Sequence, residues 1–533
     1  MTRSQWTLSD VLLRATSLAP DGEIATKRED GEWHQYTYQD AYERVCQLAH
    51  ALDELGIGAG KRVGTVAANH DRHYELYFAV PGSGRSLHTI NHRLPDEHFE
   101  YVVEDAEDAV LFVDPQFIER VECHRDAFED VSAFVVLDDE VPDTALEPVT
   151  DYESLLEGRP TEYEWPSLDP ETECGLCHTS GTTGIPKGVQ HTHGMLVRAC
   201  NMMLQTDTVA VSGSDVVFPI VPMFHGYAWA YPYVATIAGS KLVLADSHTS
   251  PEALTSVIER EGVTIASAVP TIWLDVAAYL DESGKSIAGL ERIQSGGSAV
   301  PESLIRRYDD AFDVEMIQAW GMTETAPFAT ISRAPSGLEA DCGEIDLYAS
   351  RAKAGRPVPG ISVRVRDEDG ESAPRDGETV GELQVRGEWV IDSYYERPDA
   401  DADGFTCDGW LRTGDVATWD KRGFVDVVDR KKDIIKSGGE WISSLELESE
   451  LMRNDAVAEA AVIAVDHDIW QERPFAFVVT ERDRTVDAET LNAHLRERFP
   501  KWWLPDEYEF VDALPRTSTE KFDKQQLSKR LDS

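Results

Sequence analysis

Apolar residues recur at two alternating spacings along the first 300 residues of this chain. Thr37 and Asp40 form the pattern of a helix-capping box. The apolar residues that follow it at helical spacing, up to Gly56, are Val45, Leu48, Ala49, Leu52 and Leu55. Strands are expected over 62–68, 242–244 and 264–268, and a helix over 251–261. This alternation predicts an α/β fold, in which helices cover parallel or mixed sheets.

The pattern changes between about 360 and 430. Asp-Gly pairs there separate short alternating runs such as GELQVR over 381–386, which predicts hairpins in a small β-rich subdomain. A basic run, DRKKD over 429–433, follows it. The last hundred residues then read as a helix, strands over 461–465 and 475–479, and a second helix, as in a compact α+β unit. We therefore expect a large domain over 1–430 and a small one over 431–533.

Acidic residues outnumber basic ones two to one and give the chain a net charge of −49. That charge repels nucleic acids and anionic membranes, so neither is expected as a partner. Lysine is scarce, with 14 against 35 arginines, and the acids are spread along the whole chain. The distribution favours a halophilic surface, hydrated in concentrated salt, over a local patch for a basic partner.

No signal peptide is visible at the start of the chain, and seven cysteines without regular spacing favour a reducing cytoplasm. Residues 216–240 carry no charge and reach membrane-spanning length. Three prolines interrupt that stretch, so a buried strand, loop and helix is the better interpretation, and no membrane span is expected.

The segment CGLCH over 174–178 matches the pattern of covalent haem attachment. It occurs once and runs directly into a loop of Ser, Thr and Gly. A buried strand carrying two small apolar thiols is the favoured alternative.

The most informative motif is TSGTTGIPKG over 179–188. Small hydroxyl residues and glycines after a strand allow backbone N–H groups to surround a polyphosphate, and Lys187 adds a positive charge. The spacing differs from that of P-loop NTPases, and a flexible linker is the weaker alternative. The candidate phosphate-binding residues are Thr179, Ser180, Gly181, Thr182, Thr183, Gly184 and Lys187.

With this motif the chain resembles the adenylate-forming (AMP-binding) superfamily of acyl-CoA synthetases, luciferase-type enzymes and peptide-synthetase adenylation domains. The further motifs, in the family's order and along nearly the whole chain, are PMFHG (222–226), SGGS (295–298), QAWGMTE (318–324), GRP (355–357), WLRTGD (410–415), DRKKD (429–433) and PRTSTEK (515–521). Within the family, LHTIN (87–91) and KSGGEWISS (436–444) are most similar to medium-chain fatty-acid and related alkanoate–CoA ligases. The resemblance implies an adenylation domain over 1–430 and a mobile C-terminal domain over 431–533.

It further implies an ATP-dependent acyl-CoA ligase that makes an acyl adenylate and then a thioester, releasing AMP and pyrophosphate. Two anions must approach each other in the first step, so catalysis depends on positioning and charge neutralisation. Lys521 would contact the acyl carboxylate and the α-phosphate. Glu324, assisted by Thr179, would hold Mg²⁺. Asp415 would accept the ribose hydroxyls and Arg430 would donate to ribose or phosphate.

Adenine would lie between two segments: Gly297 and Ser298 on one side, and Gln318, Ala319 and Trp320 on the other. Gly321 and Thr323 of the same motif are further candidate cofactor-binding residues. His225 is either a satisfied core histidine or, as the motif around it favours, a group that orients the acyl carboxylate. The aromatic residues that follow His225 are expected either to line the acyl pocket or to belong to the core: Tyr227, Trp229, Tyr231 and Tyr233.

For thioester formation the family rotates its C-terminal domain. Lys432 matches the hinge, and Gly438 and Gly439 match the loop that lines the pantetheine tunnel of coenzyme A, where glycine permits close approach to the backbone. A surface lysine and a plain turn are the alternatives. One position departs from the family, which usually has glycine where this chain has Glu520. We expect that carboxylate to slow adenylation modestly, less so in high salt, and the equal alternative is a further salt-adapted acid that points outward.

The expected substrates are a small carboxylic acid, ATP and coenzyme A, with Mg²⁺. Among the possible acids a medium-chain fatty acid is favoured, and short-chain, thioether-containing and aryl acids are the alternatives. The sequence leaves both a monomer and a homodimer open. The rival functions are a CoA-independent adenylating enzyme and a nucleotide-binding regulator without turnover.

Overall fold

The computed structural model describes residues 6–179, 185–333, 344–367, 369–438, 440–454, 456–467, 469–481, 484–517 and 522–531. Eight positions discussed above lie outside these ranges: Ser180, Gly181, Thr182, Thr183, Gly184, Gly439, Glu520 and Lys521.

The N-terminal part contains a seven-stranded sheet, parallel except for its last strand. Its order is β7 (Val149–Asp151), β6 (Phe134–Val136), β5 (Val110–Val113), β3 (Arg62–Val66), β4 (Ser86–Thr89), β8 (Glu173–His178) and β9 (Gly188–Thr192). β8 contains Cys174 and Cys177, both buried, as predicted for a core strand.

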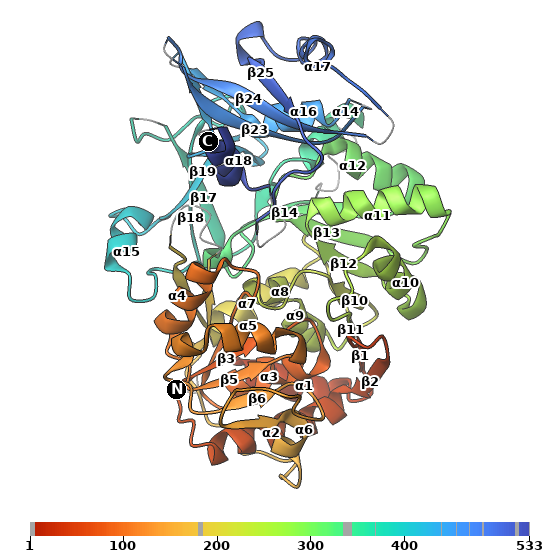
Figure 1. Ribbon diagram of the computed structural model, residues 1–533, viewed down its shortest axis with the longest axis vertical. Coiled ribbons are helices and arrows are strands. Elements are labelled where there is room, and N and C mark those ends of the chain that lie inside the picture. The colour runs from red at the N-terminus through yellow and green to blue at the C-terminus, as the bar shows by residue number, and fades with distance from the viewer. Residues whose placement is uncertain are drawn as a thin grey trace.

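A nine-stranded mixed sheet lies next to it (Figure 1). Its order is β16 (Arg356–Pro357), β15 (Thr330–Ser332), β14 (Glu315–Trp320), β13 (Arg292–Gly296), β12 (Ile265–Ala268), β10 (Val216–Pro219), β11 (Lys241–Leu244), β1 (Glu23–Lys27) and β2 (Trp33–Thr37). The six central strands, β14 to β1, run parallel.

Three hydrophobic clusters hold these layers together. The central cluster joins both sheets through α1 (Leu8–Leu18), α2 (Tyr38–Glu54), α3 (Asp71–Gly82), α7 (His193–Met203), α8 (Gly226–Trp229) and α9 (Tyr231–Ala238). On the outer face of the nine-stranded sheet lie α10 (Pro251–Glu261), α11 (Pro270–Ser283) and α12 (Glu302–Arg307), and on that of the seven-stranded sheet α4 (Asp96–Ala106) and α5 (Ile118–Cys123). Shorter helices are α6 (Tyr152–Leu156) and α14 (Glu344–Arg351). Burial on both faces explains why the parallel strands read as apolar runs.

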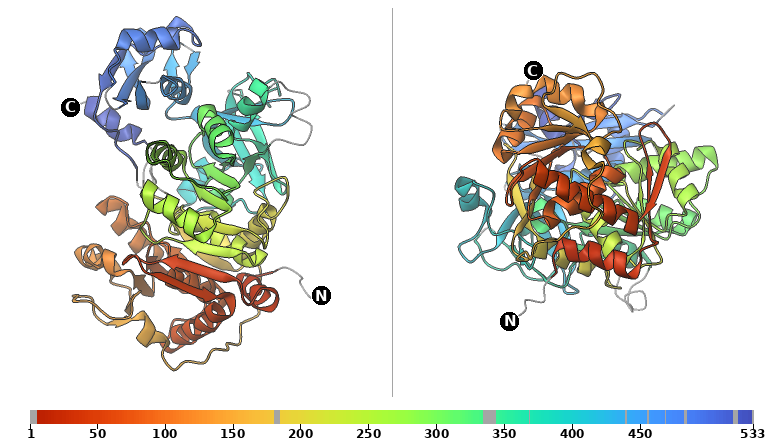
Figure 2. Two further views of the ribbon diagram at one scale, coloured as in Figure 1. Left: turned by 90° about the vertical axis from the view of Figure 1, so that its right-hand side faces the viewer. Right: turned by 90° about the horizontal axis from the view of Figure 1, so that it is seen from below.

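Two smaller sheets complete the chain. The predicted β-rich subdomain is an antiparallel sheet of β17 (Ile361–Arg366), β18 (Gly381–Gly387), β19 (Leu411–Trp419) and β20 (Val425–Arg430), with α15 (Pro398–Gly404) beside it. The C-terminal unit has β22 (Glu440–Ile442), β21 (Ile435–Ser437), β24 (Gln471–Thr480), β23 (Val457–His467) and β25 (Glu507–Phe510). Its helices are α16 (Ser444–Leu451), α17 (Ala488–Leu495) and α18 (Lys524–Leu531). It covers one end of the elongated molecule (Figure 2).

Most of the expected elements are confirmed. Thr37 and Asp40 form the capping box of α2, and residues 216–240 fold as a strand, a loop with a left-handed turn at α8, and the short buried helix α9. No helix in the described ranges is long and apolar enough to cross a bilayer. The C-terminal hairpin β23–β24 is longer than predicted, because the backbone pairing continues through polar residues beyond the apolar runs. The boundary at 430/431 stays a prediction.

Candidate functional site

The predicted motifs converge where parallel strands of both sheets end. Thr179 follows β8, Gly297 follows β13, and Trp320 ends β14. Crevices at the carboxyl ends of parallel strands are the usual ligand sites of open α/β sheets. Two of these motifs end neighbouring strands of the nine-stranded sheet, and the third follows a strand of the seven-stranded sheet.

The two ends of the phosphate loop are hydrogen-bonded to each other. The backbone N–H of Thr179 donates to the carbonyl oxygen of Lys187 at 3.0 Å, and the N–H of Lys187 donates to Thr179 Oγ1 at 3.1 Å. The antiparallel pair β8–β9 continues this closure. Lys187 is therefore held at the base of the loop.

Tyr394 connects Lys187 with Glu324. Its hydroxyl donates to Glu324 Oε1 at 2.9 Å, and the Lys187 Nζ lies 4.6 Å from the centroid of its ring. The neighbouring Tyr395 donates its N–H to the Gly188 carbonyl at 2.9 Å. Two candidate residues from different motifs thus share one aromatic side chain. Sequence reasoning missed Tyr394, whose carboxylate partner lies 70 residues away and which no local pattern marks.

Glu324 is a buried carboxylate, 5 % exposed, in the short turn Thr323–Thr325. Burial raises its pKa, although the Tyr394 hydroxyl and the charges of Arg430 and Lys187 act in the opposite direction. His191 Nε2 lies 2.8 Å from the Thr323 carbonyl and joins β9 to this turn. The turn therefore presents a desolvated carboxylate beside two cations.

Asp415 and Arg430 lie opposite each other on β19 and β20. Arg430 Nε is 2.7 Å from Asp415 Oδ1, and Trp320 Nε1 donates to Asp415 Oδ2 at 2.8 Å. Asp415 is only 2 % exposed, whereas the Arg430 side chain is 42 % exposed. These two contacts hold the Asp415 carboxylate in a fixed orientation.

The predicted adenine segments are built on closely approaching backbone. A Cβ on Gly296 would lie 2.5 Å from the carbonyl oxygen of Ala319, and one on Gly321 would lie 1.8 Å from that of Pro327. Gly297, with φ +83°, and Ser298 are exposed at the end of β13. Gln318 accepts the Val300 N–H at 3.0 Å and so ties the ends of β13 and β14 together.

The loop that carries His225 is fixed by the seven-stranded sheet. Asn69 Oδ1 accepts the N–H of Met223 at 2.7 Å, and Asn69 Nδ2 donates to the Val221 carbonyl at 2.9 Å. Thr89 Oγ1 donates to the carbonyl of Phe224. Because the loop itself follows β10, both large sheets position His225. Asn69 was not predicted, since a lone asparagine after a strand usually marks only a turn.

The five residues after His225, Gly226 to Ala230, all have positive φ, between 50° and 63°. Each left-handed L-residue costs about 1–2 kcal/mol, and such strain concentrates at functional sites. Tyr227 and Tyr233 pack against Tyr77 in the core. Trp229 instead lies near Gly296 and Phe328. Tyr231 donates a hydrogen bond to the buried Gln294 on β13.

The predicted hinge and tunnel lie on the C-terminal side of β20. Burial lowers the pKa of Lys432, and the neighbouring Asp433 opposes this. Gly438 has φ +62°, and a Cβ there would lie 2.7 Å from the ring of Trp470. The Gly438 N–H donates to the Trp470 carbonyl at 2.8 Å. Half of the Trp470 side chain is exposed, so a flat apolar surface borders the glycine loop.

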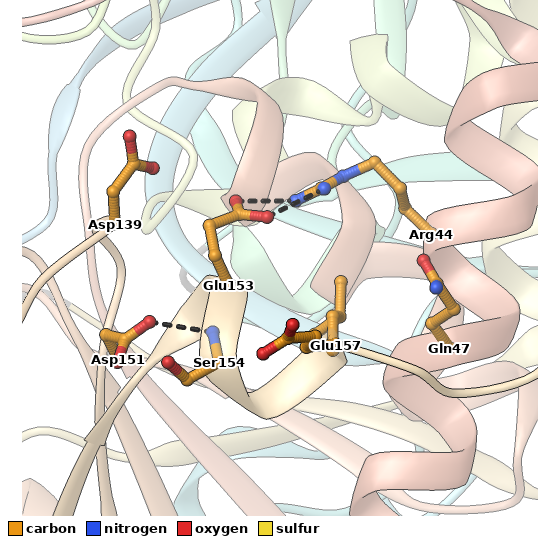
Figure 3. Close-up of a pocket in the computed structure, with 8 residues that line it drawn as sticks. Arg44, Gln47, Asp139, Asp151, Glu153, Ser154 and Glu157 are labelled. Carbon is orange, nitrogen blue, oxygen red and sulfur yellow. Dashed lines mark hydrogen bonds and ion pairs between the residues drawn. The ribbon is translucent and has the colours of Figure 1, made fainter.

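A cavity of about 350 Å³ opens elsewhere, between α2 and α6. Figure 3 shows Arg44 bound to both oxygens of Glu153, and Asp151 accepting the N–H of Ser154. Carboxylates dominate its lining, and none of the predicted site residues lines it. The cavity is therefore separate from the strand-end site.

Replacing Tyr394 by Phe is expected to reduce adenylate formation about two- to tenfold, the effect of one net hydrogen bond. Losing the hydroxyl removes a hydrogen-bond donor that lowers the pKa of Glu324, so that pKa should rise. When the pH is lowered, the variant should therefore lose activity at a higher pH than the parent enzyme. ATP–pyrophosphate exchange across pH 5 to 9 measures both effects. Tyr163→Phe, which removes a surface hydroxyl bound to Asp53, is the matched control. An unchanged pH profile would contradict the role given to Tyr394.

Comparisons with known proteins agree with this geometry. Residues 14–395 match the model of the AMP-binding enzyme family, and 446–521 match that of the AMP-binding enzyme C-terminal domain. The chain is 43 % identical over 529 residues to a long-chain-fatty-acid–CoA ligase of Thermus thermophilus, covering 99 % of this chain and 96 % of the relative. It is 38 % identical to a 3-methylmercaptopropionyl-CoA ligase of Ruegeria lacuscaerulensis (98 % and 96 % covered) and 36 % identical to a medium-chain-fatty-acid–CoA ligase of Ectopseudomonas oleovorans (99 % and 97 % covered).

Among solved structures, the anthranilate CoA ligase AuaEII in complex with anthranoyl-AMP superimposes with a TM-score of 0.89. The sequences are 25 % identical, and the match covers 99 % of this chain and 98 % of that one. The predicted α/β architecture, with a large N-terminal part and a smaller C-terminal one, is thereby confirmed.

Proposed function

Since the chain belongs to the AMP-binding enzyme family, we propose that it activates a carboxylic acid with ATP and transfers the acyl group to coenzyme A. The observation that carries this proposal is the meeting of Lys187 and Glu324 on Tyr394, beside the Asp415–Arg430 pair. One half of the site offers cations for phosphates, and the other a carboxylate for ribose. This arrangement of charges is complementary to a nucleoside triphosphate.

Adenylate formation requires the acid's carboxylate to attack the α-phosphorus while pyrophosphate leaves in line. Lys187 neutralises the phosphates from the base of their loop, and Arg430 donates to ribose or phosphate. Asp415 orients the ribose, and the backbone around Gly297 and Ala319 receives the purine. Lys521 supplies the charge between the acid and the α-phosphate.

Glu324 and Thr179 would hold Mg²⁺, which neutralises the leaving phosphates when bound. Within the described ranges no group of three or more carboxylate, histidine or cysteine side chains is arranged to bind a metal. One buried carboxylate with a hydroxyl nevertheless fits this ion, because Mg²⁺ commonly takes one or two protein carboxylates and completes its shell with substrate phosphates and water.

The acid enters on the side of His225 and Trp229. His225 orients its carboxylate, and the strained turn that follows fixes Trp229 beside the strand ends. A fatty acid is the proposed substrate class, with chain length, thioether acids and aryl acids to be separated by experiment. The relatives named above act on fatty and thioether acids, so the scaffold accommodates both.

Coenzyme A supplies the thiol for the second step. Lys432 is the proposed pivot, and the Gly438 loop with the exposed Trp470 offers a close-fitting, apolar path for pantetheine. We place the reaction in the cytoplasm because the seven cysteines without regular spacing favour a reducing compartment.

The test is a panel of C2 to C16 acids with aryl and methylthio acids, incubated with ATP, Mg²⁺ and coenzyme A in molar KCl. Equal amounts of AMP and thioester with some acid are expected. AMP without thioester would mean that the acyl group goes to an acceptor other than coenzyme A. No product with any acid would favour a regulator that binds nucleotide without turnover.

A further inference from the structure

Two histidines that the proposed site does not use meet inside the seven-stranded sheet. His88 lies on β4 in the segment LHTIN, and His178 ends β8, the neighbouring strand. His88 Nε2 lies 3.1 Å from His178 Nδ1. The side chain of His88 is fully buried and that of His178 is 4 % exposed. The pair therefore links two adjacent strands from within the core.

Each histidine also binds a carboxylate at the C-terminal end of α4. Asp108 Oδ2 lies 2.7 Å from His88 Nδ1, and Asp105 Oδ2 lies 2.9 Å from His178 Nε2. Asp108 fits there because Gly64 on β3 has no side chain: a Cβ would lie 2.6 Å from its Oδ2. The helix dipole opposes carboxylates at this end of a helix, so the histidines offset a local cost. The four side chains form one hydrogen-bonded chain between β4, β8 and α4.

The partner strand β9 is tied to the same end of α4. Gly188 begins β9 and lies opposite His178, and its carbonyl accepts the Tyr395 N–H at 2.9 Å. Arg62 Nη1 donates to the Tyr395 hydroxyl and to the Ala106 carbonyl, each at 3.0 Å. Because Ala106 is the last residue of α4, Arg62 connects that helix to Tyr395 and so to β9. Both strands of the β8–β9 pair are therefore anchored to α4 at the same level.

These anchors lie next to the two ends of the phosphate loop. Thr179 directly follows His178, and Lys187 directly precedes Gly188. The Thr179 N–H donates to the Lys187 carbonyl at 3.0 Å, so the two ends are also bound to each other. A shift of His178 or of Gly188 is therefore passed on to both Thr179 and Lys187.

We propose that His178 is a positioning residue for ATP: tied to β4 and α4, it holds Thr179 and Lys187 in place for the phosphates. This inference rests on the proposed function, because it presumes that Lys187 meets phosphate. A lysine is a point charge on a flexible stem, so the place of its backbone limits what its ammonium group can reach. The hydrogen bonds of His178 fix that place from one side of the loop, and those of Gly188 fix it from the other.

The experiment measures binding of ATP apart from use of the acid. His178→Phe keeps a planar ring but loses both hydrogen bonds, so the Kd for ATP, measured by calorimetry without acid, should rise about 5- to 30-fold. The KM for the acid should stay within about twofold, because other contacts hold the loop that carries His225. His178→Gln, whose amide nitrogen can still donate to Asp105, should restore most of the affinity for ATP. His124→Phe is the matched control, since His124 binds a different carboxylate of α4, that of Glu100, at 2.8 Å.

The outcomes distinguish this inference from the proposed function. A lower kcat in His178→Phe with an unchanged Kd for ATP would show a structural role only and overturn the inference. If His178→Phe does not fold, Tyr395→Phe removes the hydroxyl that binds Arg62 on the β9 side and should raise the Kd for ATP about two- to tenfold; an unchanged Kd there would equally overturn it. A parent enzyme that binds ATP but activates no acid would refute the ligase and leave the role of His178 intact, whereas a parent that does not bind ATP would refute both.

Discussion

Replacing Glu324 by Gln is expected to slow adenylate formation about 100- to 1,000-fold, the usual effect of losing one preorganised group that neutralises transition-state charge. The amide keeps the size and the contact with the Tyr394 hydroxyl, so the turn at Thr323–Thr325 should hold. What it loses is the negative charge beside Lys187 and Arg430. Initial rates of ATP–pyrophosphate exchange, measured over a range of Mg²⁺ concentrations, give the effect.

The same carboxylate predicts a pH dependence. Because burial raises the pKa of Glu324, the charged form is lost at a higher pH than for an exposed glutamate as the pH falls. Exchange should therefore decline on the acid side through that raised pKa, and the Gln variant should lack this decline. Glu302→Gln, which removes a carboxylate paired with Arg306 at the start of α12, controls for a general effect of charge. A Glu324→Gln enzyme within about threefold of the parent would disprove the assignment.

Replacing Asp415 by Asn is expected to raise the KM for ATP about 10- to 100-fold, since a hydrogen bond to a charged group contributes about 1.5–3 kcal/mol. The change disturbs the free enzyme too, because Arg430 loses a charged partner at 2.7 Å. The kcat at saturating ATP should change less than the KM, as ribose contacts persist throughout the reaction.

Steady-state exchange with ATP and with 2′-deoxy-ATP measures this effect. The parent enzyme should discriminate against the deoxy nucleotide, and Asp415→Asn should discriminate less. Asp408→Asn, at an exposed carboxylate paired with Arg364, supplies the comparison for the loss of a surface charge. Equal discrimination by parent and Asp415→Asn would rule out a ribose contact.

Local signals in the sequence were sufficient for elements whose causes are local. The capping box at Thr37 begins α2, and Asp-Gly turns mark the small antiparallel sheet, because these patterns act over a few residues. These predictions of elements depend on periodicity and turn chemistry, which a single sequence displays. The assignment of the site residues rests on the resemblance of the motifs and stays a prediction.

The contacts that join the motifs were not predictable in this way. Tyr394 reaches Glu324 from a turn after β18, and Asn69 holds the loop before His225 from the other sheet. Neither residue stands out in its own surroundings, since its role arises from packing between distant elements. The left-handed turn from Gly226 to Ala230 was also missed, because four of its five residues disfavour that conformation and only tertiary contacts impose it.

The proposed nucleotide-binding edge and the proposed acid-binding side differ in how freely they can evolve. At the ends of β13 and β14, a Cβ on Gly296 or on Gly321 would collide with a carbonyl oxygen. Substitutions at these two glycines therefore distort the backbone, so selection has little variation to act on there. The proposed acid side includes side chains such as Trp229, where one substitution would alter the surface that the acid meets. In the proposed ligase a new acid can therefore arise by ordinary mutation while the use of ATP stays fixed.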